Sequence, residues 1–485
     1  MNVVFVYSLD DAQSVRTPLR TLEQIQFGIS YISSFLKKHH HNTKLIVLSK
    51  FFKNTYKEII DEYIKDFSPK LICFTAVSSE YNFIATVAKY VKLHYPGIYL
   101  LIGGCHVSLN PDNIISDDFD ALCVGEGEKP TLDLISQLEK NVLPSAIPNL
   151  WIKHNYGIEK NLTRPFLQDL DDLPFPDRGM WQGWIKEQVG ARISILLGRG
   201  CPFECAYCCN SALKKISSGS YVRLRSIDNI LAEIENIVSI YPEKKEIYFE
   251  VESFGINTSW AINLCNKLKD FNETVKSPLS FGVNLRVAAG LDYEGLFFAL
   301  RSANFNFINI GLESGSEKMR REVLNREYSN ADIVSVVRLA RKFGLKVNIF
   351  NMIGMPGETY HDFKETVKVN RICQPDIHMT GIFFPYQGTR LYALCKEKGL
   401  LKNKFNNELE RRNAVLGLPG FSKKQIQKCY FWFDYDVYKG HKPLFKLLLR
   451  AAVLRFKANP YLNFIYLKIV GLPLLKRIKQ IISRS

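Results

Sequence analysis

Cysteine is scarce in this sequence, with 11 residues among 485, which is too few for a disulfide-stabilised scaffold. Acidic residues are also in deficit, since 48 Asp and Glu face 64 Lys and Arg. No run of 18 apolar residues occurs, because Lys468 and Pro473 interrupt the best candidate, and this argues against a transmembrane span. Low-complexity segments are absent and 46% of the residues are hydrophobic, which excludes general disorder.

The N-terminal residues lack the basic region, apolar core and cleavage site of a signal peptide. We therefore expect a cytoplasmic protein, in which clustered cysteines are metal ligands or catalytic groups. The net charge of +16 is uneven, because residues 441–485 contain ten Lys and Arg and no acidic residue.

Within this tail, residues 444–457 and 462–479 mix apolar side chains with basic ones. Three interpretations stay open. The segments could cap the preceding domain with a solvated basic face, or lie as peripheral helices on the inner membrane surface. Nucleic-acid binding is the least favoured, because no nucleic-acid module or P-loop accompanies the charge.

Residues 1–145 alternate short apolar runs with helix-length amphipathic segments such as Leu22–Lys38 and Tyr81–Leu93. This alternation predicts an α/β domain with a doubly wound, parallel, Rossmann-like sheet. The expected strands are Val3–Tyr7, Leu45–Leu48, Leu71–Thr75, Tyr99–Ile102 and Ala121–Val124.

Three loops that follow the predicted strands of this domain are unusual in composition. Ligands of such sheets bind where strands end, and glycine lets a ligand approach the backbone closely. Each loop alone could equally be a tight turn, but three on one edge favour a bound cofactor. The candidate binding residues are Ser78, Gly103, Gly104, His106, Gly125, Glu126 and Gly127.

A Pro-rich segment, residues 146–190, is expected to be a linker, and strand–helix alternation resumes over residues 191–400. Six repeats predict a partial (β/α)6 barrel with its chemistry at the carboxyl ends of the strands. Residues 401–485 are expected to be helical and basic. The predicted barrel strands are Ile193–Leu197, Glu246–Val251, Ser280–Leu285, Phe307–Gly311, Lys346–Ile353 and His378–Phe384.

Cys201, Cys205 and Cys208 follow the first predicted barrel strand with the spacing C-x3-C-x2-C. Three thiolates close in sequence can hold three irons of a cubane cluster and leave the fourth iron open. Structural zinc is disfavoured, since it needs four ligands and no second pair of ligands follows. A redox CxxC would explain neither Cys201 nor the glycines before it.

This spacing, with an aromatic residue before the last cysteine, resembles the signature of the radical S-adenosylmethionine (SAM) superfamily. The preceding GRGCPFEC resembles the cobalamin-dependent branch, whose members include the anaerobic Mg-protoporphyrin ester cyclase and C- and P-methyltransferases. The resemblance covers residues 1–435, and its motifs form a specific set in this order. They are IGGCHVSLNPD (102–112), VGEGEKP (124–130), YVRLRS (221–226), GLESGSE (311–317), IGMPGET (353–359) and PYQGTRLY (385–392).

The resemblance implies that the three thiolates hold one 4Fe–4S cluster, whose open iron chelates SAM. Reductive cleavage of SAM then gives a 5′-deoxyadenosyl radical that abstracts hydrogen from an unactivated carbon. Tyr207 would place its ring against the adenine or the cluster. Arg286, at a strand end, would meet the SAM carboxylate or form a structural ion pair.

The same resemblance assigns Glu313 to the ribose hydroxyls of SAM, with pairing to a nearby arginine as the alternative. Ser314 would belong to the same SAM-binding loop. The family often ends its second barrel strand in paired acids, which here read Val251-Glu252. Glu252 is therefore expected to hold the methionine ammonium, with Glu250 as its competitor.

The first domain resembles a cobalamin-binding domain but lacks the D-x-H-x-x-G motif that supplies a lower axial histidine. The family pattern places His106 along the corrin, whereas a loop histidine that caps backbone is the ordinary alternative. In related enzymes, a cobalt without a lower ligand from the protein is found where methyl transfer through methylcobalamin or cyclisation is catalysed. The scattered cysteines are expected in the core, so only one cluster is predicted.

We expect a cobalamin-dependent radical SAM methyltransferase acting on an unactivated carbon, or phosphorus, of a small-molecule metabolite or lipid. A cyclase or rearrangement enzyme is the second hypothesis, and a non-catalytic SAM or cobalamin sensor is the third. An enzyme of this kind needs an electron donor such as flavodoxin or ferredoxin. No motif identifies the substrate.

Overall fold

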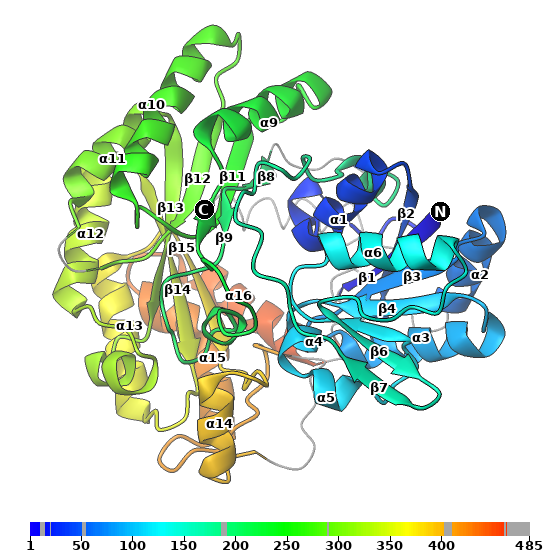
Figure 1. Ribbon diagram of the computed structural model, residues 1–485. Helices are drawn as coiled ribbons and strands as arrows, with labels where there is room; N and C mark the ends of the chain where they lie inside the picture. The colour runs from blue at the N-terminus through cyan, green and yellow to red at the C-terminus, as the bar shows by residue number, and fades with distance from the viewer. Residues whose placement is uncertain are drawn as a thin grey trace. The chain divides into compact units, whose positions relative to one another are not determined.

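The computed structural model describes residues 1–9, 15–19, 21–50, 55–185, 192–288, 291–401, 410–459 and 462. Contacts along the chain define two compact units. Unit 1 comprises residues 1–203 and 208–244, and unit 2 comprises residues 204–207 and 245–485. Parallel strands alternate with helices in both units, which confirms the predicted α/β class (Figure 1).

A seven-stranded sheet with the order β2-β1-β3-β4-β5-β6-β7 forms the centre of unit 1. The first five strands are parallel, and the other two are antiparallel to their neighbours. All five strands that the sequence predicts are present. The strands are β1 (Asn2–Leu9), β2 (Asn42–Ser49), β3 (Leu71–Thr75), β4 (Tyr99–Gly103), β5 (Ala121–Cys123), β6 (Leu150–His154) and β7 (Gly157–Lys160).

The helices of this domain follow the parallel strands, and the strand order changes direction at β1, as in a doubly wound sheet. The helix predicted over residues 22–38 is divided into a 3₁₀ turn and α1, because Gln26 caps α1 by accepting a 2.7 Å bond from the Ile29 amide. The helices are η1 (Leu22–Gln24), α1 (Phe27–Lys38), α2 (Tyr56–Phe67), α3 (Tyr81–His94), α4 (Cys105–Leu109), α5 (Pro111–Ile114) and α6 (Glu128–Glu139).

The segment expected to be a linker contains a β-hairpin that the sequence analysis missed. Strands β6 and β7 extend the sheet of unit 1 beyond β5, and the short helix α7 (Gly179–Gln182) follows them. Strand β7 is largely exposed, so its sequence carries little of the apolar alternation that predicts a strand. The domain boundaries themselves stay a prediction.

The remaining elements of unit 1 surround the cysteine motif in the sequence. A two-stranded antiparallel ribbon forms from β9 and β10, with Arg199 opposite Arg223. The elements are β8 (Arg192–Leu196), β9 (Gly198–Arg199), α8 (Asn210–Leu213), β10 (Arg223–Leu224) and α9 (Ile227–Ile240).

Unit 2 contains five parallel strands that pair in the order β15-β14-β13-β12-β11. With β8 of unit 1, all six strands predicted for the barrel are present, and a helix follows each strand of unit 2. The strands are β11 (Glu246–Phe254), β12 (Ser280–Leu285), β13 (Phe305–Glu313), β14 (Lys346–Ile353) and β15 (Ile377–Ile382). The helices are α10 (Thr258–Thr274), α11 (Tyr293–Ser302), the π-helix η3 (Met319–Val323), α12 (Asn330–Lys342), α13 (Tyr360–Cys373) and α14 (Arg390–Glu397).

Two helices, α15 (Lys423–Tyr438) and α16 (Leu444–Ala458), end the described part of the chain. Helix α15 packs on α13 and β15, and its buried Asp434 lies 3.0 Å from His378 Nε2 and 3.0 Å from Arg450 Nε. Helix α16 buries Leu447 and leaves Phe445 exposed. The predicted second tail segment lies, from residue 463 on, outside the described residues, so the membrane interpretation stays a prediction.

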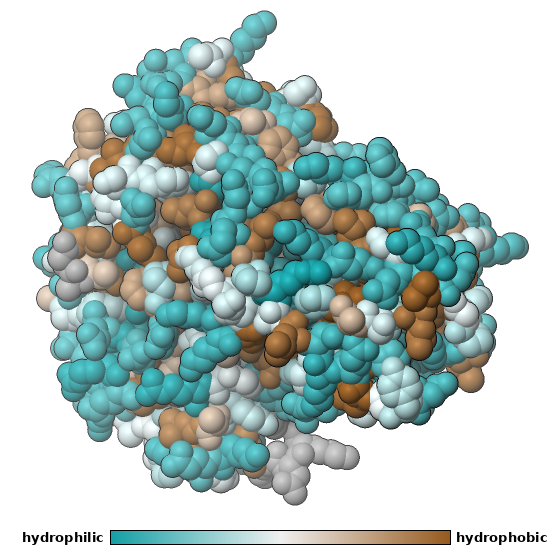
Figure 2. All heavy atoms as spheres, in the orientation of Figure 1, coloured by the Kyte–Doolittle hydropathy of each residue, from teal (hydrophilic) through white to brown (hydrophobic). Residues whose placement is uncertain are grey.

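The surface face drawn in Figure 2 is mostly hydrophilic, with hydrophobic residues in small scattered groups. In the part of the chain that the structure describes, no helix has the length and apolar character that crossing a membrane requires.

Candidate cofactor-binding sites

The three cysteines of the C-x3-C-x2-C motif lie on the loop between β9 and α8, and only the two-residue strand β9 separates this loop from the predicted barrel strand β8. Cys205 is buried, with 7% of its surface exposed, whereas Cys201 and Cys208 are half-buried. A cubane cluster bonds each thiolate to a different iron, so this donor set fits three irons of such a cluster. Their role as ligands stays a prediction from the motif.

The start of the cysteine loop is packed too tightly to accept side chains. A Cβ at Gly200, whose φ is +87°, would lie 2.0 Å from the carbonyl oxygen of Tyr221. A Cβ at Gly198 would lie 2.4 Å from the carbonyl oxygen of Arg223. The two glycines of GRGC therefore allow β9 to approach the chain at residues 221–223, and this contact fixes the residue before Cys201.

In unit 2, Arg286 lies against a cysteine of the motif. Its Nη1 donates a 2.9 Å hydrogen bond to Cys205 Sγ, from the loop that directly follows β12. The sequence assigned Arg286 to the SAM carboxylate or to a structural ion pair. Hydrogen bonds to ligand atoms orient them toward a metal group, so this contact would fix the position of the Cys205 sulfur. Arg286 is thus placed at the cluster motif, and its contact with SAM stays a prediction.

Residues 324–326 hold the second half of the cysteine loop. The backbone amide of Ala206 donates to the Leu324 carbonyl at 3.0 Å, and Asn325 Nδ2 donates to the Glu204 carbonyl at 2.9 Å. Arg326 Nη1 donates to the hydroxyl oxygen of Tyr207 at 2.7 Å. Sequence analysis did not single out this segment, because it carries no motif of its own.

The same Arg326 brings Tyr207 and Glu313 together. Its Nη1 also donates to Glu313 Oε1 at 2.7 Å, and its Nη2 donates to the Gly311 carbonyl at 3.2 Å. Burial and the Glu313 carboxylate hold the pKa of Tyr207 well above its usual value. Burial alone would lower the pKa of Arg326, but Tyr328, Tyr207 and Glu313 around it hold that pKa well above the usual value. Arg326 is therefore a permanent buried cation at the carboxyl end of β13.

The backbone at Glu313 is in an uncommon conformation. Its φ is +60°, which costs a non-glycine residue on the order of 1–3 kcal/mol and occurs preferentially at functional sites. The next residue, Ser314, is fully buried, and Gly315 leaves no room for a Cβ, which would lie 2.4 Å from the Glu365 carbonyl. The loop after β13 is thus rigid. Glu313 pairs with an arginine, the predicted alternative, and its contact with SAM ribose stays a prediction.

At the end of β11, Glu250 and Glu252 differ in exposure, since Glu250 is half-buried and Glu252 is exposed. Alternation along a strand places Glu250 on the same face as Tyr248, although the pairing of β11 with β12 becomes irregular beyond Phe249. The assignment of the SAM ammonium contact to Glu252, rather than Glu250, stays a prediction.

A ladder of polar side chains that the sequence analysis missed crosses four neighbouring strands of unit 2. Asn309 Nδ2 donates to Tyr248 Oη and to Asn284 Oδ1, both at 3.0 Å. Asn348 Nδ2 donates to Asn309 Oδ1 at 2.9 Å. Because asparagine is depleted in strands, three asparagines within predicted strands were the available signal. The ladder gives one face of the sheet hydrogen-bonding groups one layer below Arg286.

In unit 1, the predicted cobalamin loops lie at the carboxyl ends of the neighbouring strands β3, β4 and β5. Ser78 Oγ lies 3.0 Å from His106 Nδ1, which joins the first two loops. Gly103 ends β4. Gly104 has a φ of +108°, and a Cβ there would lie 2.8 Å from the Ala76 carbonyl oxygen, so both its conformation and its surroundings require glycine. The structure thus brings Ser78, Gly103, Gly104 and His106 together at one edge.

The third loop contains Gly125, whose φ is +94° and whose amide donates to Ser108 Oγ at 3.0 Å. Gly127 is the N-cap of α6, and a Cβ there would lie 2.7 Å from Ile32 Cδ1. The carboxylate of Glu126 accepts hydrogen bonds from Arg199 and Arg223. The Glu126 side chain, which the sequence assigned to cofactor binding, is therefore already engaged with protein.

His106 is a neutral imidazole at physiological pH. Burial lowers its pKa to about 4, and its ring centroid lies 4.9 Å from that of Tyr81. Asn110 Nδ2 donates to the His106 carbonyl at 2.9 Å, so the residue also has local contacts of the ordinary kind. A neutral imidazole beside strand-end glycines fits the uncharged corrin surface, since it adds no buried charge.

We expect acid to destabilise the protein through His106. The unfolded state binds the proton with a pKa of about 6.5 and the folded state only near 4, so folding stability falls as the pH decreases between these values. The full pKa shift of His106 corresponds to about 3 kcal/mol in the free energy of unfolding. Between pH 7 and 4.5, the Tm of His106→Gln should therefore fall less than that of the wild type. Equal decreases in both proteins would contradict the prediction.

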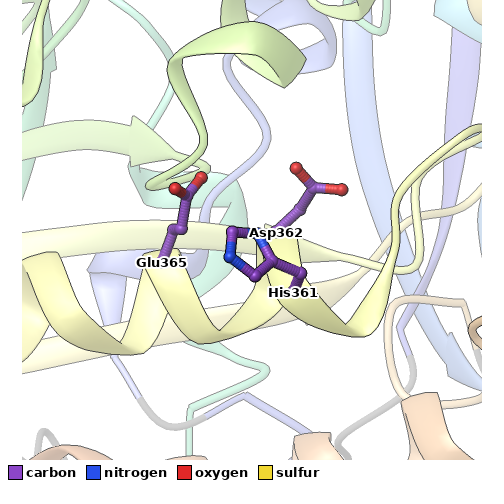
Figure 3. Close-up of side chains that lie close together, drawn as sticks. All are labelled: His361, Asp362 and Glu365. Atoms are coloured by element: carbon purple, nitrogen blue, oxygen red, sulfur yellow. The ribbon is translucent and has the colours of Figure 1, made fainter.

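One other group of potential metal ligands occurs among the described residues. His361, Asp362 and Glu365 lie at the start of α13, with ligand atoms within 4.8 Å of one another (Figure 3). Asp362 Oδ2 accepts bonds from the Thr359 amide and hydroxyl, and Oδ1 accepts one from Ser316 Oγ at 2.7 Å. The Asp362 carboxylate thus caps a helix, so the group is explained without a metal.

Most of the scattered cysteines are core residues, as predicted from their lack of ligand spacing. Cys105 is the exception because it is exposed at the start of α4. The buried ones are Cys73, Cys123, Cys265, Cys373, Cys395 and Cys429.

Comparison with known proteins agrees with this arrangement. Residues 20–135 match the family model of the B12 binding domain, and residues 195–369 match that of the radical SAM superfamily. A protein of Pyrococcus horikoshii named as an uncharacterized methyltransferase is 26% identical over 438 residues, which cover 87% of this chain and 92% of that protein. The anaerobic magnesium-protoporphyrin IX monomethyl ester cyclase of Rubrivivax gelatinosus is 23% identical over 387 residues, which cover 76% of this chain and 66% of the cyclase.

The fold also resembles the solved structure of the radical SAM methyltransferase TsrM from Kitasatospora setae with cobalamin and a [4Fe-4S] cluster bound. The TM-score is 0.66 at 15% identity, and the match covers 91% of this chain and 89% of that one. At this identity the likeness concerns the fold alone. The chain therefore carries a B12-binding domain and a radical SAM domain, the domain pair of a cobalamin-dependent radical SAM enzyme with a 4Fe–4S cluster, SAM and cobalamin as cofactors.

Proposed function

We propose that the protein is a methyltransferase that moves a methyl group from SAM to an unactivated carbon, or to phosphorus, of a metabolite or lipid. The observation that carries the proposal is one chain with both a cysteine motif after a barrel strand and three adjacent loops suited to cobalamin. The names of the Pyrococcus relative and of TsrM, both methyltransferases, support it.

When bound, the cluster supplies an electron to SAM and cobalamin supplies the methyl group. In the proposed reaction at carbon, one SAM leaves as S-adenosylhomocysteine after giving its methyl group. A second SAM takes the substrate hydrogen and leaves as methionine and 5′-deoxyadenosine. Electrons come from a donor such as flavodoxin or ferredoxin.

The chain's own residues would position these groups. Cys201, Cys205 and Cys208 would hold the cluster, with Arg286 donating a hydrogen bond to the Cys205 sulfur. Arg326 would fix Tyr207, because its guanidinium is already bonded to the phenol oxygen.

The rest of the SAM site would come from the strand ends of unit 2. The rigid loop of Glu313 and Ser314 would present polar groups to the ribose, and Glu252 would hold the methionine ammonium. In this arrangement, the polar ladder headed by Asn309 would face the substrate side, because it lies one layer beneath these strand ends.

A cyclase or rearrangement activity is the second candidate, favoured by the similarity to the Rubrivivax cyclase. Such a reaction abstracts a hydrogen but transfers no methyl group, so it yields 5′-deoxyadenosine without S-adenosylhomocysteine. A non-catalytic sensor of SAM or cobalamin would yield neither product. The three functions are therefore separated by the products of SAM.

The test uses the anaerobically reconstituted full chain with hydroxocobalamin, a strong reductant and SAM labelled in its methyl group. About four irons per chain are expected for one cubane cluster. With an extract of small molecules and lipids as substrate source, methyl transfer predicts S-adenosylhomocysteine and a labelled product heavier by one methyl group. 5′-Deoxyadenosine alone would instead favour the cyclase, and intact SAM would favour the sensor. The Cys201/Cys205/Cys208 triple alanine variant is the control.

A further inference from the structure

Two glutamates and two arginines form a buried ion-pair network inside unit 1. Glu126 Oε1 lies 2.9 Å from Arg199 Nη1 and 2.9 Å from Arg223 Nη1. Glu128 Oε1 lies 2.5 Å from Arg199 Nη2. The side chains of Glu128 and Arg223 are 7% and 4% exposed, so these charges are largely removed from water.

The carboxylate of Glu126 uses both oxygens in this network. Its Oε2 accepts a 2.8 Å hydrogen bond from the Leu167 amide, while Arg223 Nη1 donates to the Leu167 carbonyl at 2.8 Å. Burial by itself would raise the pKa of Glu126, but Arg199 and Arg223 hold it below the usual value. Glu126 is thus an ionised residue whose two carboxylate oxygens already accept hydrogen bonds from the protein, so they are largely occupied before any cofactor binds.

The two ends of the network lie beside the two cofactor motifs. Glu126 directly follows Gly125, the strand-end glycine of the third cobalamin loop. Arg199 precedes the first motif cysteine, Cys201, by two residues. Because β9 pairs with β10, Arg199 and Arg223 are also neighbours in the backbone, so the network ties both strands of the ribbon to Glu126.

The link between Arg199 and Cys201 is stiff. Gly200 has a φ of +87°, and a Cβ there would lie 2.0 Å from the Tyr221 carbonyl, so the backbone has no room to shift toward residue 221. A displacement of Arg199 would therefore move Cys201 with it. On the other side, the Gly125 amide is held by Ser108 Oγ, so a shift of this loop would be passed to Glu126.

We infer that Glu126 is a positioning residue that couples the cobalamin loop to the cluster loop, so that cobalamin binding and cluster loading strengthen each other. This inference rests on the cofactor set of the proposed function, but not on methyl transfer. Ordering either loop would prepare the other through the shared ion pairs, and linkage requires the effect to be reciprocal. A network that only stabilises the fold would leave the two binding events independent.

The experiment measures the Kd of hydroxocobalamin for the full-length protein, once free of cluster and once reconstituted with iron and sulfide. For the wild type, we expect cobalamin to bind at least about fivefold more tightly to the cluster-loaded form, the lower range of known coupling. In Glu126→Gln, the ratio of the two Kd values should fall to about one, because a neutral amide cannot hold both arginines.

Asp133→Asn provides the matched control. Asp133 lies on α6, the helix that also carries Glu128, but it pairs with Arg164 and is outside the network. It should keep the wild-type ratio. Arg199→Lys serves as the second variant if Glu126→Gln folds poorly, because lysine keeps the charge but cannot bridge two carboxylates as a guanidinium does. Its ratio should also approach one.

A wild-type ratio of one, or an unchanged ratio in Glu126→Gln and Arg199→Lys, would overturn the inference. Absence of cobalamin binding in both forms of the wild type would overturn the inference too, together with the assignment of cobalamin as a cofactor. A protein that shows the coupling but transfers no methyl group would support the inference and refute only the proposed function.

Discussion

Replacing Cys201, Cys205 and Cys208 together by alanine should abolish iron binding and reduce the cleavage of SAM to background. The three thiolates are the predicted iron ligands, and the loop contains no histidine or acidic cluster to replace them. Cobalamin should still bind, with the weaker affinity of the cluster-free protein, because the loops after β3, β4 and β5 do not contain these residues. The measurements are iron content, the brown absorbance of the cluster, 5′-deoxyadenosine formation and cobalamin titration.

Cys209→Ala is the matched control, because Cys209 adjoins Cys208 in the same loop but lies outside the motif spacing. It should keep its iron and its SAM cleavage. A triple variant that retained iron would refute the ligand assignment. If Cys209→Ala lost the cluster and Cys208→Ala retained it, the third ligand would be Cys209 and not Cys208.

The strands could be predicted from the sequence because they are buried, continuous apolar runs that end in glycine or polar residues. Strand β3 is an example, since its predicted bounds Leu71–Thr75 are those observed. Strand β7 escaped prediction for the opposite reason. It lies at the edge of the sheet, where Gly157–Lys160 is mostly exposed and has no apolar face.

The site was predictable where chemistry requires adjacent residues, as in the cysteine motif and the glycine loops. It was not predictable where the partners come from distant parts of the chain. Glu126 and Arg199 are separated by 73 residues, and a single sequence contains no signal that pairs them. For Glu313, an arginine partner was one of two open interpretations, but only the fold identifies it as Arg326.

Arg326→Gln should have the second large effect, on both SAM cleavage and stability. The Arg326 side chain is 5% exposed and bonds Tyr207, Glu313 and the Gly311 carbonyl. Its loss leaves the Glu313 carboxylate, 15% exposed, without its cation, and breaking such a pair costs about 3–5 kcal/mol. Misplacement of Tyr207 and Glu313 should lower the rate of SAM cleavage by about 100-fold. Thermal unfolding measures the loss of stability, and SAM titration with 5′-deoxyadenosine formation measures the effect on SAM cleavage.

One further variant separates the role of the charge from that of the geometry, and a second one serves as a control. Arg326→Lys keeps a cation beside Glu313 but cannot bond Tyr207, Glu313 and Gly311 in one plane, so it should recover stability more than SAM cleavage. Arg321→Gln changes an exposed arginine of η3 that pairs only with its neighbour Glu322 among the described contacts, and it should stay within about 0.5 kcal/mol of wild type. If Arg326→Gln cleaved SAM at the wild-type rate, the Tyr207–Arg326–Glu313 network would be a structural feature of unit 2 with no part in binding SAM.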